Sequence, residues 1–404
     1  MVEEAPPPHP PLELADGVPD VTETPEQLAR VVLDVAAGTG PVALDAERAS
    51  GYRYSQRAYL VQLRRGTGPT ALIDPIALPD LSTLGTALGD AEWVLHAANQ
   101  DLACLAEVGL RPPRLFDTEL AARLAGHERV GLATMVATVL GRRLDKGQSS
   151  ADWSQRPLTT SLLRYAALDV EVLLDLRDHL ERELREQGKW AWALEEFAAV
   201  ATATTAAPRV DPWRRTSGLH RLRTTRQYAV VRALWTARDE HARARDIAPG
   251  RVLPDAAIIE AAIAAPASRE ALAALPSYRG RGTRRRLDQW WGAVESALAL
   301  PPAELPRVAG PGDGGPPPAH RWAERDPVAA SRLNRVRAAV LVVAAEHALP
   351  TENLLEPAVL RRVTWTPPAA LDADTVGAAL AQHGARAWQV TLLAGPVAEA
   401  LQQP

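Results

Sequence analysis

The sequence predicts an α/β domain followed by one or two all-helical modules. Three closely spaced apolar stretches, separated by glycine and proline residues, precede residue 76 and predict strands. Apolar residues at helical spacing dominate after residue 219, and glycine and proline dominate the segment 302–321. Strands followed by helices indicate an α/β or α+β core of ~170 residues, with helical modules and a linker behind it.

The elements of the first domain are expected in a definite order. Three strands should form an antiparallel meander, namely PVALDAE (41–47), AYLVQLRR and TALIDP (70–75). A helix, a short apolar strand and a second helix follow, namely 81–89, 93–97 and 100–109. Later helices are expected at about 117–125, 131–140 and 159–187.

Composition divides the chain into five segments. The boundary near 201–212 is small, polar and contains proline. A weak repeat, APGRVLPDAAI (248–258) and LPTENLLEPAV (349–359), is explained by two copies of one helical module or by chance similarity between alanine-rich helices. The expected segments are a flexible leader (1–23), a first domain (24–205), a helical domain (214–300), a linker (301–326) and a second helical domain (327–404).

Composition also excludes several classes of protein. Of the 404 residues, 47% are hydrophobic and 23% are charged, which excludes wholesale disorder. The lone cysteine, Cys104, excludes a disulfide framework and any zinc site built from several cysteines. No stretch approaches ~18 uncharged apolar residues, and the acidic, proline-rich start differs from a secretory signal. We therefore expect a cytoplasmic protein.

Charge is distributed unevenly along the chain, whose net charge is −4. Residues 1–210 contain 20 basic and 30 acidic residues, whereas residues 211–300 contain 16 and 9. This asymmetry fits a first domain that holds metal ions through carboxylates and a second that contacts phosphates. Chance variation in surface composition is the alternative explanation.

Three separated segments carry acidic residues in positions that point to one site. Asp45 and Glu47 lie two apart in an otherwise apolar strand and therefore share a face of it. Asp101 follows a buried strand and opens a helix. Tyr165 and Asp169 are four apart on a helix, where Asp169 interrupts an apolar stripe and should point inward. Buried carboxylates need compensation, which a metal ion can provide.

Each of these segments also has an ordinary structural interpretation. An Asp-x-Glu pair can lie on an exposed strand edge, Asp101 can be a helix N-cap, and Tyr165 can pair with Asp169 in a partly buried contact. The order of the segments strengthens the functional interpretation. A strand with Asp-x-Glu comes first, then an aspartate after a later strand, then Tyr-x-x-x-Asp in a late helix.

In these segments the sequence resembles the tyrosine-bearing branch of the DnaQ-like superfamily of 3′–5′ exonucleases. Residues from about 24 to 200 resemble the ribonuclease D family in particular. The similarity extends to AYLVQLRRG, to FDTELAARLAG (116–126) and to LGRRLDKGQSSADWSQRPLTTSLLRYAALDVEVLLDL (140–176). The resemblance implies a ribonuclease H-like fold with a mixed sheet and a metal-dependent exonuclease activity.

Carried over to this sequence, the resemblance implies two divalent metal ions and four carboxylate ligands: Asp45, Glu47, Asp101 and Asp169. It also implies that Tyr165 orients or helps to deprotonate the attacking water. The chemistry agrees, because phosphodiester hydrolysis needs an activated water and charge relief at the leaving oxygen, which two metals provide. Hard oxygen ligands without thiolates or a histidine cluster favour Mg²⁺ or Mn²⁺ over zinc.

One motif departs from the family pattern. Threonine and a large apolar residue usually surround the glutamate, whereas this sequence reads DAER, with Ala46 and Arg48. The apolar residue often packs against the terminal base, and Arg48 can instead stack on that base or contact phosphate. A surface position for Arg48 is the alternative. The departure affects substrate preference rather than the metal site.

Residues from about 214 to 298 resemble the HRDC domain, a helical module that ribonuclease D shares with RecQ-type helicases. The matching stretches are RQYAVVRALWTARDEHARARDIAPGRVLPD and ALPSYRGRGTRRRLDQWWGAV, in which Trp290 is expected in the core and Trp291 partly exposed. Arginines in and after the glycine loop are expected to grip a phosphate backbone, unless they belong to a solvated loop. They are Arg279, Arg281, Arg284, Arg285 and Arg286.

The leading hypothesis is a metal-dependent 3′–5′ exoribonuclease that trims structured or precursor RNA, such as transfer RNA, and releases nucleoside 5′-monophosphates. Its expected partner is the single-stranded 3′ tail of an RNA. The alternatives are an exonuclease that acts mainly on DNA and a non-catalytic nucleic-acid-binding scaffold. A helicase is excluded because no GxxxxGK[ST] loop is present. The C-terminal modules can fold back on the nuclease as a funnel, which would favour a monomer.

Overall fold

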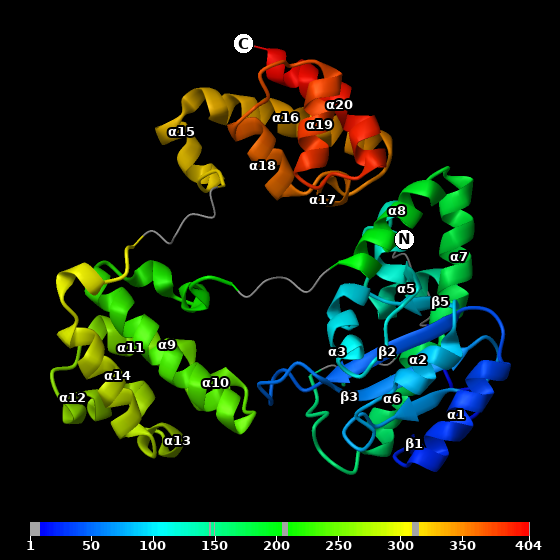
Figure 1. Cartoon of the computed structure of the whole chain (residues 1–404), viewed down its shortest axis with the longest axis horizontal. Coiled ribbons are helices and arrows are strands. Elements are labelled where there is room, and N and C mark those ends of the chain that lie inside the picture. The colour runs from blue at the N-terminus through cyan, green and yellow to red at the C-terminus, as the bar shows by residue number, and fades with distance from the viewer. Residues whose placement is uncertain (1–8, 145–146, 149, 204–208, 309–314, 404) are drawn as a thin grey trace, which may run out of the picture.

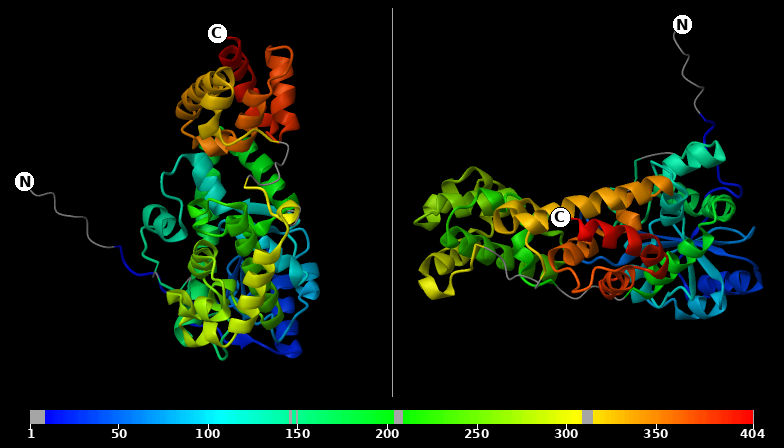
Figure 2. Two further views of the ribbon diagram at one scale, coloured as in Figure 1. Left: turned by 90° about the vertical axis from the view of Figure 1, so that its left-hand side faces the viewer. Right: turned by 90° about the horizontal axis from the view of Figure 1, so that it is seen from above.

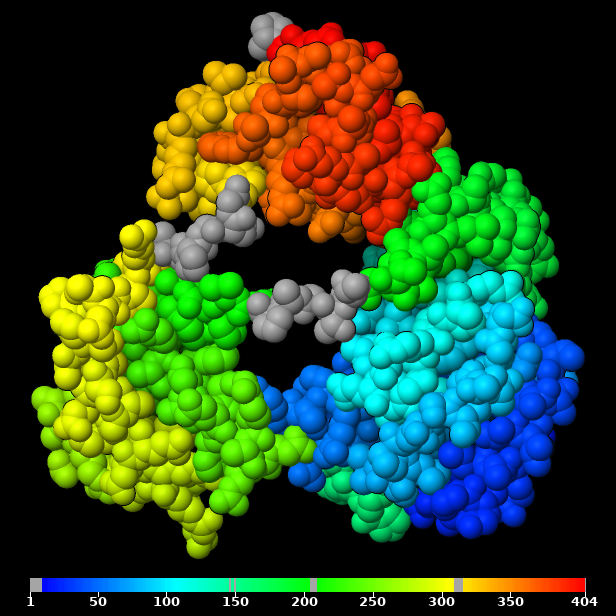
Figure 3. Space-filling view, viewed as in Figure 1, coloured from blue at the N-terminus to red at the C-terminus, as the bar shows by residue number. Residues whose placement is uncertain are grey.

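Three lobes make up the protein in the computed structural model, which describes residues 9–144, 147–148, 150–203, 209–308 and 315–403. The first domain, up to residue 203, contains the sheet (Figure 1). The middle domain (209–308) and the C-terminal domain (315–403) are helical in their described parts. The three lobes surround a central opening in the space-filling view of Figure 3. The expected order of a strand-containing core and helical modules is confirmed.

A six-stranded mixed sheet forms the centre of the first domain. Its strands are β1 (Val21–Thr22), β2 (Val42–Arg48), β3 (Ala58–Arg65), β4 (Ala71–Ile73), β5 (Glu92–Leu95) and β6 (Arg114–Asp117). They lie in the order β1-β4-β3-β2-β5-β6. The expected antiparallel meander is β2, β3 and β4, while β1, β5 and β6 pair in parallel with their neighbours. Val42, Ala43 and Leu44 are fully buried, which fits a strand in the middle of the sheet.

Helices pack around this sheet. α6 lies on β2 and β3, and α7 contacts β5. The sequence predicted a single helix over 159–187, but the structure has two helices there, which meet at Val172. The helices of this domain are α1 (Pro25–Ala37), α2 (Ser82–Leu88), α3 (Leu102–Glu107), α4 (Thr118–Ala125), α5 (Leu132–Leu140), α6 (Thr160–Glu171), α7 (Leu173–Glu186) and α8 (Trp190–Thr202).

The segment expected as a flexible leader is described from residue 9 onward. Its end forms β1, which pairs with β4 at the edge of the sheet. The backbone N–H of Leu12 donates to the carbonyl of Arg143 at 2.8 Å. The sheet therefore extends into this segment, and residues 1–8 lie outside the described residues.

The two helical domains repeat one arrangement of helices. In each, a long helix is followed by a four-residue helix and then by a third helix, so that α9, α10 and α11 correspond to α16, α17 and α18. The second HRDC-like domain therefore stays a prediction, which this shared order of helices supports. The middle domain contains α9 (Thr225–Arg245), α10 (Pro249–Val252), α11 (Asp255–Ala264), α12 (Arg269–Ala274), α13 (Arg281–Arg284) and α14 (Leu287–Ala299). The C-terminal domain contains α15 (Trp322–Arg325), α16 (Pro327–Glu346), α17 (Thr351–Leu354), α18 (Pro357–Trp365), α19 (Ala373–Gln382) and α20 (Ala387–Gln402).

Short 3₁₀ helices occur between these elements. They are η1 (Ala98–Gln100), η2 (Pro212–Arg215), η3 (Leu219–Arg221), η4 (Pro276–Tyr278), η5 (Pro302–Glu304) and η6 (Ala319–Arg321). The expected linker, 301–326, thus contains η5, η6 and α15, and its residues 309–314 lie outside the described residues. None of the helices in the described part of the chain has the length and apolar character that a bilayer crossing requires.

The two helical domains are attached to the first domain in different ways. The C-terminal domain shares one continuous apolar cluster with it, and its helices lie beside α8 in Figures 1 and 2. There Trp388 stacks on Trp192 with ring centroids 5.0 Å apart and donates from Nε1 to Glu196 at 3.0 Å. The middle domain has its own apolar cluster, which contains Trp290, fully buried as expected, with the partly buried Trp291 against it.

Candidate active site

Asp45 and Glu47 lie on β2, in the middle of the sheet. Strand alternation places both on one face, where Asp45 is opposite Gln62 of β3 and Glu47 is opposite Leu60. The helix α6 packs over β2 and β3, and it carries Asp169 on the side that faces the two carboxylates of β2. The two carboxylates of β2 therefore face a helix that brings a third one.

Asp101 is positioned by the turn that follows β5. The carboxylate of Asp117 accepts hydrogen bonds from the backbone N–H groups of Ala97 and Ala98 at 3.0 and 2.9 Å. It thereby holds Ala97 in a left-handed conformation with φ of 59°. Asp101 is the N-cap residue of α3, but its side chain makes no capping hydrogen bond. The buried carboxylate is thus left for the site, although its position is that of a cap.

Tyr165 and Asp169 lie one turn apart on α6. The N-cap residue of this helix is Thr159, whose hydroxyl accepts from the backbone N–H of Leu162 at 3.4 Å. The ring of Tyr165 packs against Trp153 with centroids 6.2 Å apart, which fixes the direction of the phenol. Asp169 is only 6% exposed, and its Oδ1 has no hydrogen-bond partner among the described residues.

The carboxylates converge on one pocket. Oxygen atoms of Asp45, Glu47 and Asp169 lie within 4.8 Å of one another. Asp101 and Tyr165 line the same pocket, which has a volume of about 490 Å³. The structure thus brings together all five residues that the sequence proposed for catalysis, from β2, from the N-cap of α3 and from α6.

Arg48 is also part of this pocket. Its Nε lies 3.6 Å from Oδ1 of Asp101, and its side chain is 27% exposed. It is therefore partly buried beside the carboxylates rather than on the outer surface. One guanidinium neutralises only a part of four converging acids.

Burial raises the pKa of all four carboxyl groups. The pKa of Asp45 rises to about 6 because burial disfavours the anion. The pKa of Asp101 rises to about 8 through burial and then through the charge of Asp45. Burial and neighbouring carboxylates also hold the pKa values of Glu47 and Asp169 well above their usual range. The site is thus short of positive charge.

This donor set fits divalent metal ions. The ligands are carboxylate oxygens, a buried oxygen of Asp169 lacks a partner among the described residues, and the raised pKa values mark anions without compensation. Hard oxygen donors of this kind bind Mg²⁺ or Mn²⁺. The chemistry of the pocket is therefore compatible with metal binding.

We expect the metal-free protein to lose stability between pH 6 and pH 8. Because the pKa of Asp101 is about 8 in the folded protein and 3.8 ordinarily, the folded state binds more protons than the unfolded chain in this window. The free energy of unfolding then falls as the pH rises, by on the order of 1 kcal/mol per pH unit. Thermal melts in a chelator should show that the stability of Asp101→Asn falls less steeply with pH than that of the wild type. Equal slopes of stability against pH in the two proteins would contradict this assignment.

Sequence reasoning missed His96, which lines the same pocket. The hydroxyl of Thr118 donates to the carbonyl of Leu95 at 3.2 Å, so Nδ1 of His96 donates to that hydroxyl at 2.9 Å. Burial lowers the pKa of His96 to about 4, which keeps the ring neutral. A polar residue at the end of an apolar strand, five positions before Asp101, was the available signal.

The candidate arginines of the middle domain lie before α14, and none of them is among the residues that line the pocket. Arg279 donates to the carbonyl of Ala274 at 3.1 and 3.0 Å, and Arg286 donates to the carbonyl of Gly282 at 3.4 Å. The side chains of the remaining three are exposed: Arg281, Arg284 and Arg285.

Comparisons with protein families agree with this geometry. Residues 19–185 match the 3′–5′ exonuclease family, residues 227–294 match the HRDC domain, and residues 315–401 match the 3′ to 5′ exonuclease C-terminal domain. The mixed sheet, the converging carboxylates and these matches define a 3′–5′ exonuclease with an HRDC domain.

Curated relatives specify the family. The chain is 34% identical over 313 residues to ribonuclease D of Acidiphilium cryptum, which covers 74% of this chain and 78% of that protein. It belongs to the ribonuclease D family and is a 3′–5′ exoribonuclease. It is 37% identical to ribonuclease D of Shewanella sp. over 232 residues, which cover 56% of this chain and 59% of that relative.

Solved structures share the whole architecture. A protein from Bifidobacterium adolescentis superposes with a TM-score of 0.89 at 38% identity and covers 98% of this chain and 100% of its own. Escherichia coli RNase D, an exoribonuclease involved in structured RNA processing, superposes with a TM-score of 0.66 at 28% identity, covering 91% and 99%. The expected fold, with an exonuclease domain followed by helical modules, is confirmed.

Proposed function

We propose that the protein trims the 3′ ends of structured or precursor RNAs, such as transfer RNA, and releases nucleoside 5′-monophosphates with the help of two Mg²⁺ or Mn²⁺ ions. The convergence of four carboxylates and a tyrosine in one pocket carries this proposal. The opening between the lobes supports a substrate whose single-stranded end enters while its folded part stays outside (Figure 3). We propose that it carries out this processing in the cytoplasm.

The residues of the pocket have separate roles in this reaction. The ions would be held by Asp45, Glu47, Asp101 and Asp169. When bound, they supply an activated water and relieve charge on the leaving oxygen. Burial and then the nearby carboxylates raise the pKa of Tyr165, so its hydroxyl stays protonated at neutral pH. Such a hydroxyl orients the attacking water by a hydrogen bond rather than by removing a proton.

Arg48 contacts the terminal nucleotide in this proposal. Its side chain is 27% exposed within the pocket and lies next to Asp101, where family members usually have an apolar residue. A planar guanidinium can stack on a base or donate to a phosphate. Arg48 therefore belongs to substrate recognition and not to the metal ligands.

The test uses the purified full chain and a hairpin RNA with a single-stranded 3′ tail. The tail should shorten from its 3′ end with release of nucleoside 5′-monophosphates, in Mg²⁺ or Mn²⁺ but not in a chelator. A DNA hairpin of the same sequence in the same reaction separates the alternatives, because faster loss of the DNA tail would identify a DNA exonuclease. Binding of both without release of nucleotide would identify a scaffold.

The arginines before α14 are proposed to hold the phosphate backbone of the RNA. Replacing Arg284, Arg285 and Arg286 with alanine should weaken RNA binding and flatten its salt dependence, because each lost phosphate contact lowers the slope by about 1. Binding isotherms between low and high salt measure this change. Equal slopes in the variant and the wild type would contradict a phosphate role.

We further propose that the protein acts as a monomer. One chain already supplies the pocket and the three lobes that surround the opening. A mass measurement in solution that gave a dimer at working concentration would contradict this proposal.

A further inference from the structure

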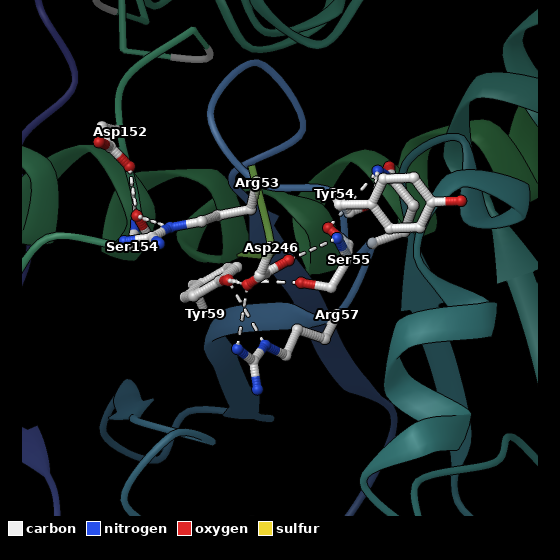
Figure 4. A network of polar contacts seen from close by, with 9 residues as sticks. Arg53, Tyr54, Ser55, Arg57, Tyr59, Asp152, Ser154 and Asp246 are labelled. Atoms are coloured by element: carbon white, nitrogen blue, oxygen red, sulfur yellow. Dashed lines mark hydrogen bonds and ion pairs between the residues drawn. The ribbon is translucent and has the colours of Figure 1, made fainter. Parts of the chain in front are cut away.

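The loop between β2 and β3, residues 49–57, is held by the HRDC domain. Its backbone N–H at Ser55 donates to Oδ1 of Asp246, the C-cap residue of α9, at 2.8 Å (Figure 4). The other oxygen of Asp246 accepts from Arg57 and from the hydroxyl of Tyr59, each at 3.3 Å. The carboxylate of Asp246 thus accepts hydrogen bonds from three residues of the exonuclease domain.

A second set of contacts reaches the loop from the same side. The hydroxyl of Tyr54 donates to Asp239 at 3.0 Å and accepts from Arg243 at 3.2 Å. Figure 1 shows the loop reaching toward α10, where Arg251 lies. Residues of the HRDC domain therefore contact the loop along much of its length, from Gly51 to Arg57.

Arg251 contacts the part of the loop that is nearest to the catalytic pocket. Its Nε donates to the carbonyl of Gly51 at 2.8 Å, and its guanidinium lies 4.0 Å from the ring centre of Tyr52. The backbone N–H of Ala248 donates to the carbonyl of Tyr52 at 2.9 Å. These contacts fix two consecutive backbone carbonyls of the loop.

The same loop forms one side of the catalytic pocket. Ser50 and Gly51 line the pocket, two and three positions after Arg48. Farther along, Arg53 donates to Ser154 at 2.8 Å, and Ser154 donates to Asp152 at 2.5 Å. Ser150 and Ala151, just before Asp152, line the pocket as well. Two pocket-lining segments thus meet at the loop.

This attachment depends on directed polar contacts. Whereas the C-terminal domain shares an apolar cluster with the exonuclease domain, the HRDC domain has its own, which Tyr54 joins from outside. The side chains of Arg57 and Asp246 are 49% and 30% exposed. Each contact therefore contributes only a small stabilising free energy by itself, and the loop is held by several contacts together.

We propose that Asp246 and Arg251 of the HRDC domain are positioning residues for the exonuclease reaction, which they serve by holding Ser50 and Gly51 in place as a side of the catalytic pocket. The HRDC domain thereby completes the site that binds the terminal nucleotide. This inference rests on the proposed function. A positioning role differs from the binding of RNA far from the active site, because loss of the positioning contacts should impair the reaction even with the smallest substrate.

The test uses the p-nitrophenyl ester of a nucleoside 5′-monophosphate, a substrate of one nucleotide for the catalytic pocket, whose lining residues all belong to the exonuclease domain. The variants are Arg251→Ala and Asp246→Asn, because asparagine tolerates the left-handed conformation of Asp246, whose φ is 47°. We expect KM for the ester to rise about five- to tenfold while kcat stays within about twofold, because a loosened loop must be ordered on binding.

Matched controls remove the same charges beside these positions. Arg245→Ala and Glu240→Gln alter exposed residues of α9 and should leave KM unchanged. Thermal melts show whether the variants fold, and Mn²⁺ affinity shows whether the carboxylates are intact.

The outcomes are distinguishable. If the wild type hydrolyses the ester and both variants match it in KM, the positioning role is overturned. If the variants lose only affinity for long RNA, the HRDC domain acts as a distant binding surface and the inference is again overturned. If the folded wild type shows no metal-dependent hydrolysis of ester or RNA, the proposed function itself fails.

Discussion

Replacing Asp101 with asparagine should abolish metal-dependent trimming of a 3′-tailed RNA, with a fall in kcat of roughly 10³-fold or more. The substitution keeps the shape of the side chain and removes an anion that lies buried in the pocket, 3.6 Å from Arg48. Without that charge the site binds divalent ions more weakly, and relief of charge on the leaving oxygen is lost. Single-turnover assays across a range of Mn²⁺ concentrations measure the effect.

A control on the same helix separates charge from position. Glu107 is exposed at the end of α3, so Glu107→Gln removes one negative charge without entering the pocket. It should leave trimming unchanged. Activity of Asp101→Asn equal to that of the wild type at the same metal concentration would remove Asp101 from the catalytic set.

Replacing Tyr165 with phenylalanine should lower kcat by roughly 10²-fold and leave RNA binding nearly intact. The ring packs against Trp153, and phenylalanine preserves this contact, so the variant loses only the hydroxyl. Its expected effect is confined to the chemical step, because the proposed role of that hydroxyl is to orient the attacking water. Binding of a 3′-tailed RNA in Ca²⁺ and turnover in Mn²⁺ measure the two properties separately.

Tyr228 provides the matching control. It is buried in the HRDC domain, so Tyr228→Phe also removes one phenolic hydroxyl but does so outside the pocket. Its turnover should equal that of the wild type. A Tyr165→Phe variant that trims RNA at the wild-type rate would show that the hydroxyl has no part in the reaction.

The carboxylate site was predictable because its pieces are local patterns. Strand alternation places Asp45 and Glu47 on one face, and helical spacing places Tyr165 one turn from Asp169. Their convergence with Asp101 could not be derived from spacing, because it depends on how β2, α3 and α6 pack. The resemblance to known exonucleases supplied that step.

Other elements were missed although their signals are present. α1 begins with a capping box in which Thr24 and Gln27 exchange hydrogen bonds, and the sequence TPEQ shows it. Asp117 was quoted in a motif, but its role in holding the turn before Asp101 was not foreseen. The break at Val172 has no glycine or proline to mark it.

Contacts between distant parts of the chain were beyond sequence reasoning. The pairing of Ser55 with Asp246 joins residues that are 191 positions apart, and no local pattern announces it. The same holds for Trp192 and Trp388, which stack across two domains. Polar and aromatic side chains of this kind look like ordinary surface residues until their partners are placed.

The stacking of Trp388 on Trp192 has a consequence for shortened versions of the protein. The first domain depends on the last domain of the chain for its packing. It shares its apolar core with that domain, and not with the HRDC domain that follows it directly in sequence. Cutting the chain after residue 300 would expose the surface of Trp192 on α8 that Trp388 covers, and such an exposed apolar surface favours aggregation. Deletion series that proceed from the carboxyl end would then report misassembly before they report any loss of RNA recognition.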